Sequence, residues 1–583
     1  MAQQNGWFLL ESRPSLSSLK AENSINSPAP PVNEPKVTQP KEKSNPPANT
    51  SLRPTEAKEN QENQENQLHL KKEDSVNLPS EVPKKEYSPN LPAEVPKKEY
   101  SPNLPAEVPK KSEMVSTPAP EYKPVKNNLP ENPSGSEDAL SLWASDRIIH
   151  TRHSQTVGSR GPVLKQDSLL HETLETFIHT KILERPVHVK GFGAFGTFET
   201  THAMGKYTKL SFLQTPGQQV SVMVRFSLAS SNKGTPDTSR NVRGFSTKFY
   251  TRQGVFDLLC NHLPVLLVRD GVRFPEAFTS LEPSPVNNLI DPERFWKFAA
   301  RAPEATHFVT WLYSDAGTIK SLRHIRGFSV NTFVWRNENG VRRYVKYHWI
   351  PLQGEETIDR QEAARLAAAN PNIAGQDLYD AIAAGNAPGY ELRVQLMDPG
   401  DEASLPYDPL DCTKVWDEQR YPLLPVGRMV LNRNPENYME QVEKVAFSPS
   451  NLLEGAELSD DKLLQARANI YWDSQRHRLG QGFRSIPVNH QENWTPDEQI
   501  TSGTGRQVDG QLVRAELPNP DNFTQAGQRY RSLSPVEQNH LVDNLAADLA
   551  VVSNDTRNTV LGYFRSASTE LEIRVREEIN SQL

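Results

Sequence analysis

The chain has 583 residues and a formal net charge of -7 at pH 7, which is enough length for one large domain with appendages. This mild negative charge gives no reason to expect binding to nucleic acid or to an anionic membrane. The sequence shows no secretory signal, no apolar run of membrane-spanning length and only two cysteines, Cys260 and Cys412. We therefore expect a soluble protein of a reducing compartment, with a cytoplasmic location as the first prediction and a spore or another targeted location as the alternative.

Residues 1–140 predict a disordered tail. They are rich in Pro, Lys, Glu, Asn and Ser and poor in large apolar side chains, so burial cannot offset the entropy of ordering them. The 13-residue unit "NLPSEVPKKEYSP" begins at Asn77, and closely similar units begin at Asn90 and Asn103. Two prolines precede the lysine pair of each unit, which is typical of extended polyproline chain. A plain spacer and a docking segment for a partner both remain open.

The region after the tail is rich in predicted strands. Residues 218–227, "QQVSVMVRFS", alternate so that Val220, Val222, Val224 and Phe226 share one face, while Arg225 and Ser227 share the other. The pattern indicates further strands at 242–251, 254–268, 308–315, 330–336, 341–350 and 390–397, with "NENG" as a turn, and a helix over "RQEAARLAAAN".

Glycines at 191, 193 and 196 in "HVKGFGAFGTFE" follow the G-x-G-x-x-G spacing of dinucleotide sites. Such a site requires a helix directly after the glycines. The next residues, "TFETTHAMGKYTKLSFL", show no helical apolar period. We therefore reject the dinucleotide interpretation and expect the glycines to allow close packing of a strand that follows His188.

Two helices are predicted nearer the C-terminus. The first runs over 459–480, with Ser459 as its N-cap and Gly480 as its stop. In the second, Ser534 is the expected N-cap, and Glu537 completes a capping box. Pro535 is expected at the first helical position, and Leu541, Leu545, Leu549 and Val552 then form an apolar stripe.

The first helix carries a polar stripe, since Arg467, Tyr471, Ser474 and Arg478 fall on one face. Spacing alone is typical of a solvated amphipathic face. The alternative is a metal ligand: Arg467 one turn before Tyr471 favours an ionised phenol, and a phenolate binds ferric iron. Arg478 could then pair with a carboxylate.

Several segments resemble the monofunctional haem catalases. They are "RPVHVKGFGAFGTFE", "VMVRFSLASSNKGTPDTSRNVRGFSTKFYT", "FDLLCNHLPVLLVRDGVRFPE", "YPLLPVGRMVLNRNPENY" and "RANIYWDSQRHRLG", and the match runs from about residue 150 to 583. The resemblance implies an α+β catalase fold, with an N-terminal arm at 141–187, an eight-stranded antiparallel β-barrel at 188–433, a wrapping segment with the haem-ligand helix at 434–519 and a C-terminal helical domain at 520–583. It implies disproportionation of hydrogen peroxide by a homotetramer, with no nucleic-acid or membrane partner.

The same resemblance implies the site. His188 is the distal acid–base residue, Asn261 binds peroxide and Ser227 supports the histidine. Tyr471 is the iron ligand of a b-type haem, with Arg467 as its partner. Further haem contacts are implied for Arg185, Val187, Arg225, Phe274 and Arg478. Val187 narrows the substrate channel. NADPH is not predicted, because Ala316 stands where relatives that bind it often carry a basic residue.

The chain also departs from the family pattern at Asn241, Cys260, His262, Leu266, Leu267, Asn331, Trp472 and Gln475. These positions bear on rate, channel electrostatics and haem orientation. The alternatives to a catalase are a catalase-fold enzyme acting on organic or lipid hydroperoxides, and a haem or scaffold protein without activity. Val187 before the distal histidine argues against the first, since fatty-acid hydroperoxide isomerases tend to carry threonine there. The intact set of His188, Asn261, Arg467 and Tyr471 argues against the second.

Overall fold

A computed structural model describes residues 140–141, 148–149, 153–160, 162–179, 181–490, 510–517 and 520–582. The predicted disordered tail at 1–140 lies, apart from its last residue, outside the described residues, and the predicted domain boundaries stay predictions. Along the described chain no helix is both long and apolar enough to cross a membrane.

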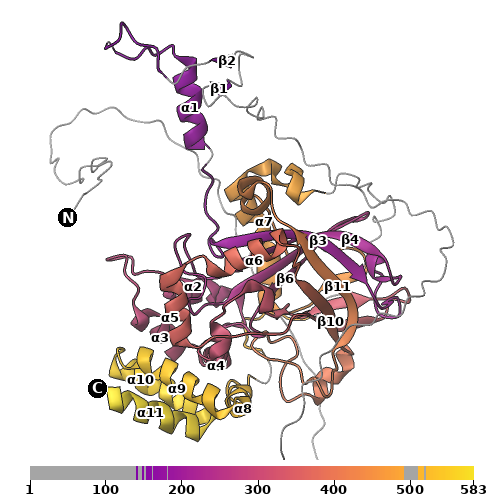
Figure 1. Cartoon of the computed structure of the whole chain (residues 1–583). Helices are drawn as coiled ribbons and strands as arrows, with labels where there is room; N and C mark the ends of the chain where they lie inside the picture. Colours follow the sequence, from indigo (N-terminus) through magenta and orange to yellow (C-terminus); the bar gives the residue numbers. More distant parts are fainter. Residues whose placement is uncertain are drawn as a thin grey trace, which may run out of the picture. The chain divides into compact units, whose positions relative to one another are not determined.

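A closed antiparallel barrel forms the centre of the fold (Figure 1). Each strand pairs with the next, and the last pairs with the first. Closure satisfies the backbone groups that an open sheet would leave at its edges, and it confirms the predicted eight-stranded barrel. In order around the barrel the strands are β3 (Gly191–Thr200), β4 (Gln219–Leu228), β5 (Arg243–Thr251), β6 (Gly254–Asn261), β7 (Gly327–Phe328), β9 (Arg342–Pro351), β10 (Gly389–Met397) and β11 (Leu424–Arg433).

Three smaller pairings complete the strand structure. Strand β8 (Phe333–Arg336) also pairs with β9, and β12 (Ala456–Leu458) pairs with β8. The predicted "NENG" turn joins β8 to β9, with the Asn337 amide donating to the carbonyl of Val341 and Gly340 at φ +75°. Two short strands, β1 (Leu140–Ser141) and β2 (Ile148–Ile149), form a separate antiparallel pair.

The barrel interior is filled by apolar and aromatic side chains. Val222, Val224 and Phe226 are buried in one cluster with Phe245 and Trp349. The rings of Phe245 and Trp349 stack at a centroid distance of 6.0 Å. Because side chains alternate along a strand, Arg225 and Ser227 lie on the opposite, outer face of β4. The interior therefore supplies stability, and the outer face carries the polar chemistry.

Two strand predictions were wrong or too long. Residues 308–315 fall mostly in helix α4 (Thr306–Leu312), not in a strand. This helix is buried on nearly every side, so the residues 308–315 show no amphipathic helical period that would distinguish them from a buried strand. The strand predicted over 254–268 ends at Asn261, before Pro264, which cannot donate to a ladder.

Helices surround the barrel and gather at the C-terminus. The last four lie beside one another (Figure 1), and the capping box between Ser534 and Glu537 is present as predicted. Leu541, Leu545 and Leu549 are buried in a second apolar core shared with residues of the 263–330 segment. The helices are α1 (Ser168–His179), α2 (Phe274–Ser280), α3 (Pro292–Ala300), α5 (Arg360–Ala369), α6 (Ile373–Ala383), α7 (Lys462–Leu479), α8 (Thr524–Ser532), α9 (Pro535–Leu549), α10 (Asn554–Ala567) and α11 (Thr569–Gln582).

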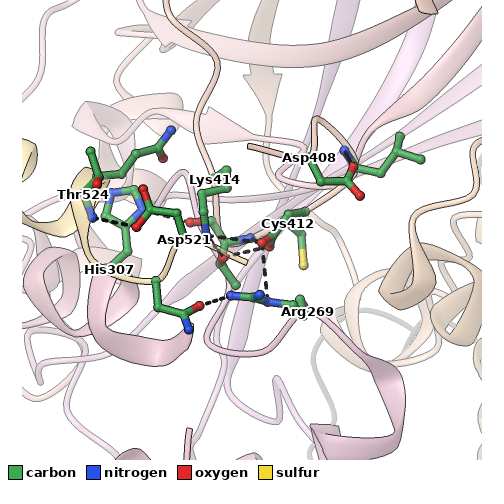
Figure 2. A network of polar contacts seen from close by, with 12 residues as sticks. Arg269, His307, Asp408, Cys412, Lys414, Asp521 and Thr524 are labelled. Carbon is green, nitrogen blue, oxygen red and sulfur yellow. Dashed lines mark hydrogen bonds and ion pairs between the residues drawn. The ribbon is translucent and has the colours of Figure 1, made fainter. Parts of the chain in front are cut away.

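A buried polar network fastens the start of this C-terminal region to the segment before β11 (Figure 2). Asp411 pairs with Arg269 at 3.4 Å and with Lys414 at 3.2 Å. Arg269 also donates to the amide oxygen of Asn522, which lies just before α8. Gln525 exchanges two hydrogen bonds with the backbone of residue 415, at 2.9 and 3.0 Å. Segments far apart in the sequence are thus joined by directional contacts as well as by apolar packing.

A second buried pair fixes the β5–β6 hairpin. Lys248 donates to Asp257 at 2.7 Å, and their side chains are 1% and 0% exposed. Asp257 also accepts from the Ser448 backbone and from the Asn451 amide, at 3.0 and 2.6 Å. The hairpin is therefore tied to the chain that leads into α7.

Candidate functional site

Adjacent barrel strands place four residues in one row across the sheet. Gly191 pairs with Ser227, Ser227 with Gly244, and Gly244 with Asn261. Paired residues in a sheet point to the same face. Serine and asparagine side chains therefore alternate with glycines, which leave open space between them.

The imidazole of His188, a residue just before β3, occupies that space. Its backbone adopts φ +61° and donates to the carbonyl of Ala229 at 2.9 Å. Its Nδ1 lies 3.0 Å from the hydroxyl oxygen of Ser227. A Cβ added at Gly244 would sit 2.6 Å from that hydroxyl and 2.9 Å from the imidazole. The left-handed backbone, which costs a non-glycine residue energy, and the glycine opposite together hold the imidazole in one place.

The electrostatic surroundings keep His188 neutral. Burial, followed by the positive charges of Arg225, Arg467 and Arg185, lowers the pKa of His188 to about 3. A neutral imidazole whose Nδ1 is engaged by Ser227 has Nε2 left for a substrate. The side-chain amide of Asn261 makes no hydrogen bond to any residue that the structure describes, so it too is available for binding.

Three arginines converge near this row. Arg225 donates to the backbone carbonyls of residues 188 and 189, at 3.0 Å each. Arg185 pairs with Glu443 at 3.2 Å, and Arg478 lies 4.0 Å from the same carboxylate. Burial and repulsion from Arg225 and Arg478 push the pKa of Arg185 well below its ordinary value. Three guanidinium groups around one carboxylate leave two positive charges uncompensated, which suits a dianion.

Backbone shape makes room for the arginine cluster. A Cβ at Gly191 would lie 2.5 Å from the guanidinium carbon of Arg225, so the first glycine of the G-x-G-x-x-G spacing accommodates a charged group. A short π-helix runs over Met439–Glu443, and the carbonyls of Glu443 and Val445 at and just after its end accept from Arg185 and Arg478. π-Helical turns are frequent at functional sites.

Helix α7 packs against the outer face of the barrel through Tyr471. The expected N-cap at Ser459 was wrong: Asp461 caps the helix and accepts from the amides of residues 463 and 464 at 3.0 Å each. The Ser459 hydroxyl instead donates to the carbonyl of Thr332. Gly480, at φ +86°, ends the helix as predicted.

Tyr471 and Arg467 face inward from α7. Arg467 Nη2 donates to the Tyr471 hydroxyl at 3.3 Å. Burial opposes the charge of Arg467, but Tyr471 and then Asp461 outweigh it, and the pKa of Arg467 is raised. Tyr471 packs against an apolar cluster on the outer face of the barrel that includes Met223 and Val442. The phenol thus packs on apolar side chains with the cationic Arg467 beside it.

Two expected site residues are apolar. Val187 is half-buried and directly precedes His188. Phe274 opens α2 and packs on Phe278 at a ring distance of 4.2 Å. Neither side chain can form a hydrogen bond or an ion pair with the distal row or the arginines, and their haem roles stay predictions.

Some residues of the site were not predicted. Glu443 lies 258 positions from Arg185, and Tyr438 donates to the carbonyl of Gly191 at 3.0 Å. No local pattern around either residue indicates this role, because the contacts form only when the 434–445 segment returns to the barrel.

Comparison with known proteins agrees with this architecture. Residues 144–520 match the family described as "Catalase". The chain belongs to the catalase family. Its activity is accordingly the decomposition of hydrogen peroxide, and the family implies a haem cofactor. The two uncompensated positive charges of the arginine cluster fit the two carboxylates of a haem. Residues 517–579 match a second family, "Catalase-related immune-responsive".

Individual catalases resemble most of the chain. Catalase of Helianthus annuus is 38% identical over 463 residues, covering 74% of this chain and 94% of the relative. Catalase-2 of Arabidopsis thaliana gives the same identity and coverage. Among solved structures, catalase A of Saccharomyces cerevisiae has a TM-score of 0.71 at 32% identity and covers 75% of this chain and 98% of its own.

Gly244→Ala tests the space beside the imidazole. We expect the added methyl group to break the His188–Ser227 hydrogen bond and to lower oxygen release by about 10²-fold, the typical cost of a displacement of about 1 Å. Gly400→Ala is the control, because nothing lies within 4 Å of a Cβ there. Oxygen release per bound haem is the measurement, and equal rates in the two variants contradict the assignment.

Acid should destabilise this catalase through its buried histidines. Burial lowers the pKa of His188 and His348 to about 3 and of His307 to about 4. Below the ordinary pKa of about 6.5 the unfolded chain binds protons that the folded chain does not, so stability falls as the pH drops from 6.5 toward 4. We expect the urea midpoint to fall over this range.

His307→Gln isolates one contribution to that acid effect. An amide can donate to the carbonyl of Thr413 and accept from Trp311 as the imidazole does. The variant should therefore lose less stability between pH 6.5 and 4 than the wild type. His171→Gln, at an exposed position, is the control. The same pH slope in wild type and His307→Gln contradicts the prediction.

Proposed function

We propose that His188, Asn261 and Ser227 carry out the proton chemistry of hydrogen peroxide disproportionation. The supporting observation is the pairing of a neutral imidazole, whose Nδ1 is held by Ser227, with the unengaged amide of Asn261 on the same face of the barrel. A positioned base near a positioned substrate is what general acid–base catalysis requires.

The residues act in sequence on a bound peroxide. Asn261 donates a hydrogen bond to one peroxide oxygen and fixes the molecule beside the imidazole. His188 Nε2 accepts the proton of one peroxide oxygen and returns it to the other, so that this second oxygen carries both protons and is ready to leave as water. Ser227 holds the ring so that Nε2 reaches both oxygens. When bound, the haem supplies the iron and the two-electron exchange between successive peroxides, which yields water and oxygen.

Tyr471 is proposed as the iron ligand of a b-type haem. Arg467 donates a hydrogen bond to the phenol oxygen and so places a positive charge beside the atom that would bind the iron. Arg185, Arg225 and Arg478 are proposed to pair with the haem carboxylates, where their mutual repulsion would be relieved. Phe274 and Val187 complete the proposal, as a ring beside the haem and as a constriction of the peroxide channel.

Assembly and location complete the proposal. The family resemblance supports a homotetramer, and a cytoplasmic location is part of the proposal. NADPH is left out, because Ala316 is not basic and its carbonyl is already bonded to His262 Nε2 at 2.9 Å.

Oxygen-electrode measurements on the haem-loaded chain test the function. Hydrogen peroxide should release oxygen, whereas peroxidase donors and a lipid hydroperoxide should react much more slowly. The ferric protein should show a tyrosinate-type spectrum that Tyr471→Phe removes. Tyr563→Phe, on α10, is the control. Normal ligation in Tyr471→Phe refutes the ligand, and a lipid hydroperoxide as the preferred substrate refutes the reaction.

A further inference from the structure

Asn331 is one of the departures from the family pattern, and it lies at a strained break in a barrel strand. It sits between β7 and β8, both of which pair with β9. The preceding residue, Val330, has φ +60°, which is rare for a β-branched residue. Asn331 is 0% exposed, and its backbone is held by two hydrogen bonds with Ser329, at 2.7 and 3.1 Å. Such strain persists only where surrounding contacts require it.

The Asn331 side chain bridges two charged groups of helix α7. Its Nδ2 donates to Asp461 Oδ2 at 2.7 Å, and its Oδ1 accepts from Arg467 Nη1. The amide can adopt only this orientation, since a guanidinium has no acceptor and a carboxylate has no donor. The bridge therefore connects the N-cap of α7 to Arg467, six residues further along the chain.

The two amino groups of Arg467 donate to different partners. Nη1 is held by Asn331, and Nη2 reaches the Tyr471 hydroxyl at 3.3 Å. A planar guanidinium fixed at one end has little freedom at the other. The position of Nη2 at the phenol oxygen consequently depends on the amide.

We propose that Asn331 is a positioning residue for Tyr471: a neutral amide bridge that anchors Arg467 to Asp461 and keeps its full positive charge directed at the phenol oxygen. The inference rests on Tyr471 being the haem ligand. A neutral bridge matters because a carboxylate at this position would neutralise Arg467 and weaken its pull on the phenolate. The bridge thereby sets how much charge the phenolate donates to iron.

The reduction potential of the haem-loaded protein tests the bridge. In Asn331→Leu the guanidinium loses its anchor, the phenolate donates more charge, and the ferric state gains stability. We expect at least a tenfold change in the ferric–ferrous equilibrium constant, which is about 59 mV toward lower potential. Asn331→Asp keeps the size of the side chain and should shift the potential in the same direction. Asn331→His should keep the reduction potential of the wild type, because a neutral imidazole can donate to Asp461 and accept from Arg467.

Controls separate this inference from the proposed function. Asn544→Leu removes another buried asparagine, one that bonds the carbonyl of Tyr313 in the C-terminal helices, and should leave the potential unchanged. A wild type without a tyrosinate spectrum refutes the ligand proposal. A wild type with that spectrum, together with an Asn331→Leu potential equal to the wild-type value, overturns the bridge alone. If Asn331→Leu does not fold, the Asn331→Asp and Asn331→His pair decides, and equal potentials in these two variants overturn it.

Discussion

Replacing His188 by alanine is expected to lower oxygen release from hydrogen peroxide by about 10²- to 10⁴-fold, the usual contribution of a general acid–base group. The imidazole is the neutral, positioned base of the distal row, and its removal leaves Asn261 without a proton acceptor beside it. Haem content should change little, since the cofactor is proposed to be held by Tyr471 and the arginines. The measurement is the initial oxygen rate per bound haem.

His477→Ala is the matched control for His188→Ala. His477 lies on the exposed side of α7, so its removal should leave the rate unchanged. The oxygen rate of Ser227→Ala should lie between those of His188→Ala and His477→Ala, because the imidazole remains but loses one orienting hydrogen bond. An undiminished rate in His188→Ala would show that another group transfers the proton.

Lys248→Met is expected to lower the free energy of unfolding by about 3–5 kcal/mol, the usual cost of breaking one side of a buried ion pair. Asp257 would remain fully buried with only two neutral donors, from Ser448 and Asn451. Burial already raises the pKa of Asp257 even with the lysine present. The difference in stability between the wild type and Lys248→Met should therefore become smaller at lower pH, where this carboxyl takes up a proton.

The double variant Lys248→Met/Asp257→Leu separates charge burial from packing. Removing both partners of a buried pair is often close to neutral, so we expect the double variant to be more stable than Lys248→Met alone. Arg365→Met, which breaks an exposed pair with Glu362, is the control and should cost less than about 1 kcal/mol. Chemical denaturation midpoints give the comparison, and a double variant less stable than Lys248→Met contradicts this account.

The barrel and much of the site could be predicted from the sequence. Alternation over 218–227 placed Arg225 and Ser227 opposite the apolar residues, and the ladder agrees. The capping box at Ser534 and the stop at Gly480 follow from local chemistry that tertiary contacts do not change. The missing helix after "GFGAFG" correctly removed the dinucleotide interpretation, since all three glycines lie in β3.

What escaped prediction depends on contacts between distant segments. Ser459 has the chemistry of an N-cap, but a carbonyl at Thr332 takes its hydroxyl and Asp461 caps instead. The segment 308–315 shows no helical period, because neighbours cover α4 on nearly every side. Glu443 gains its role only when the 434–445 segment returns to Arg185. Local sequence indicates the chemistry of these residues but not the distant partners that they contact.

The row of Gly191, Ser227, Gly244 and Asn261 makes catalysis a reporter of strand alignment. A slip of two residues in any one of these pairings would keep apolar side chains inside the barrel, because the inside–outside alternation has a period of two. Circular dichroism and apolar burial would barely register such an isomer. The slip would nevertheless move His188, Ser227 or Asn261 out of alignment with the other two residues, and we expect peroxide turnover to stop. For refolded or engineered versions of this chain, specific activity is thus a sensitive test of whether the barrel has closed in its correct alignment.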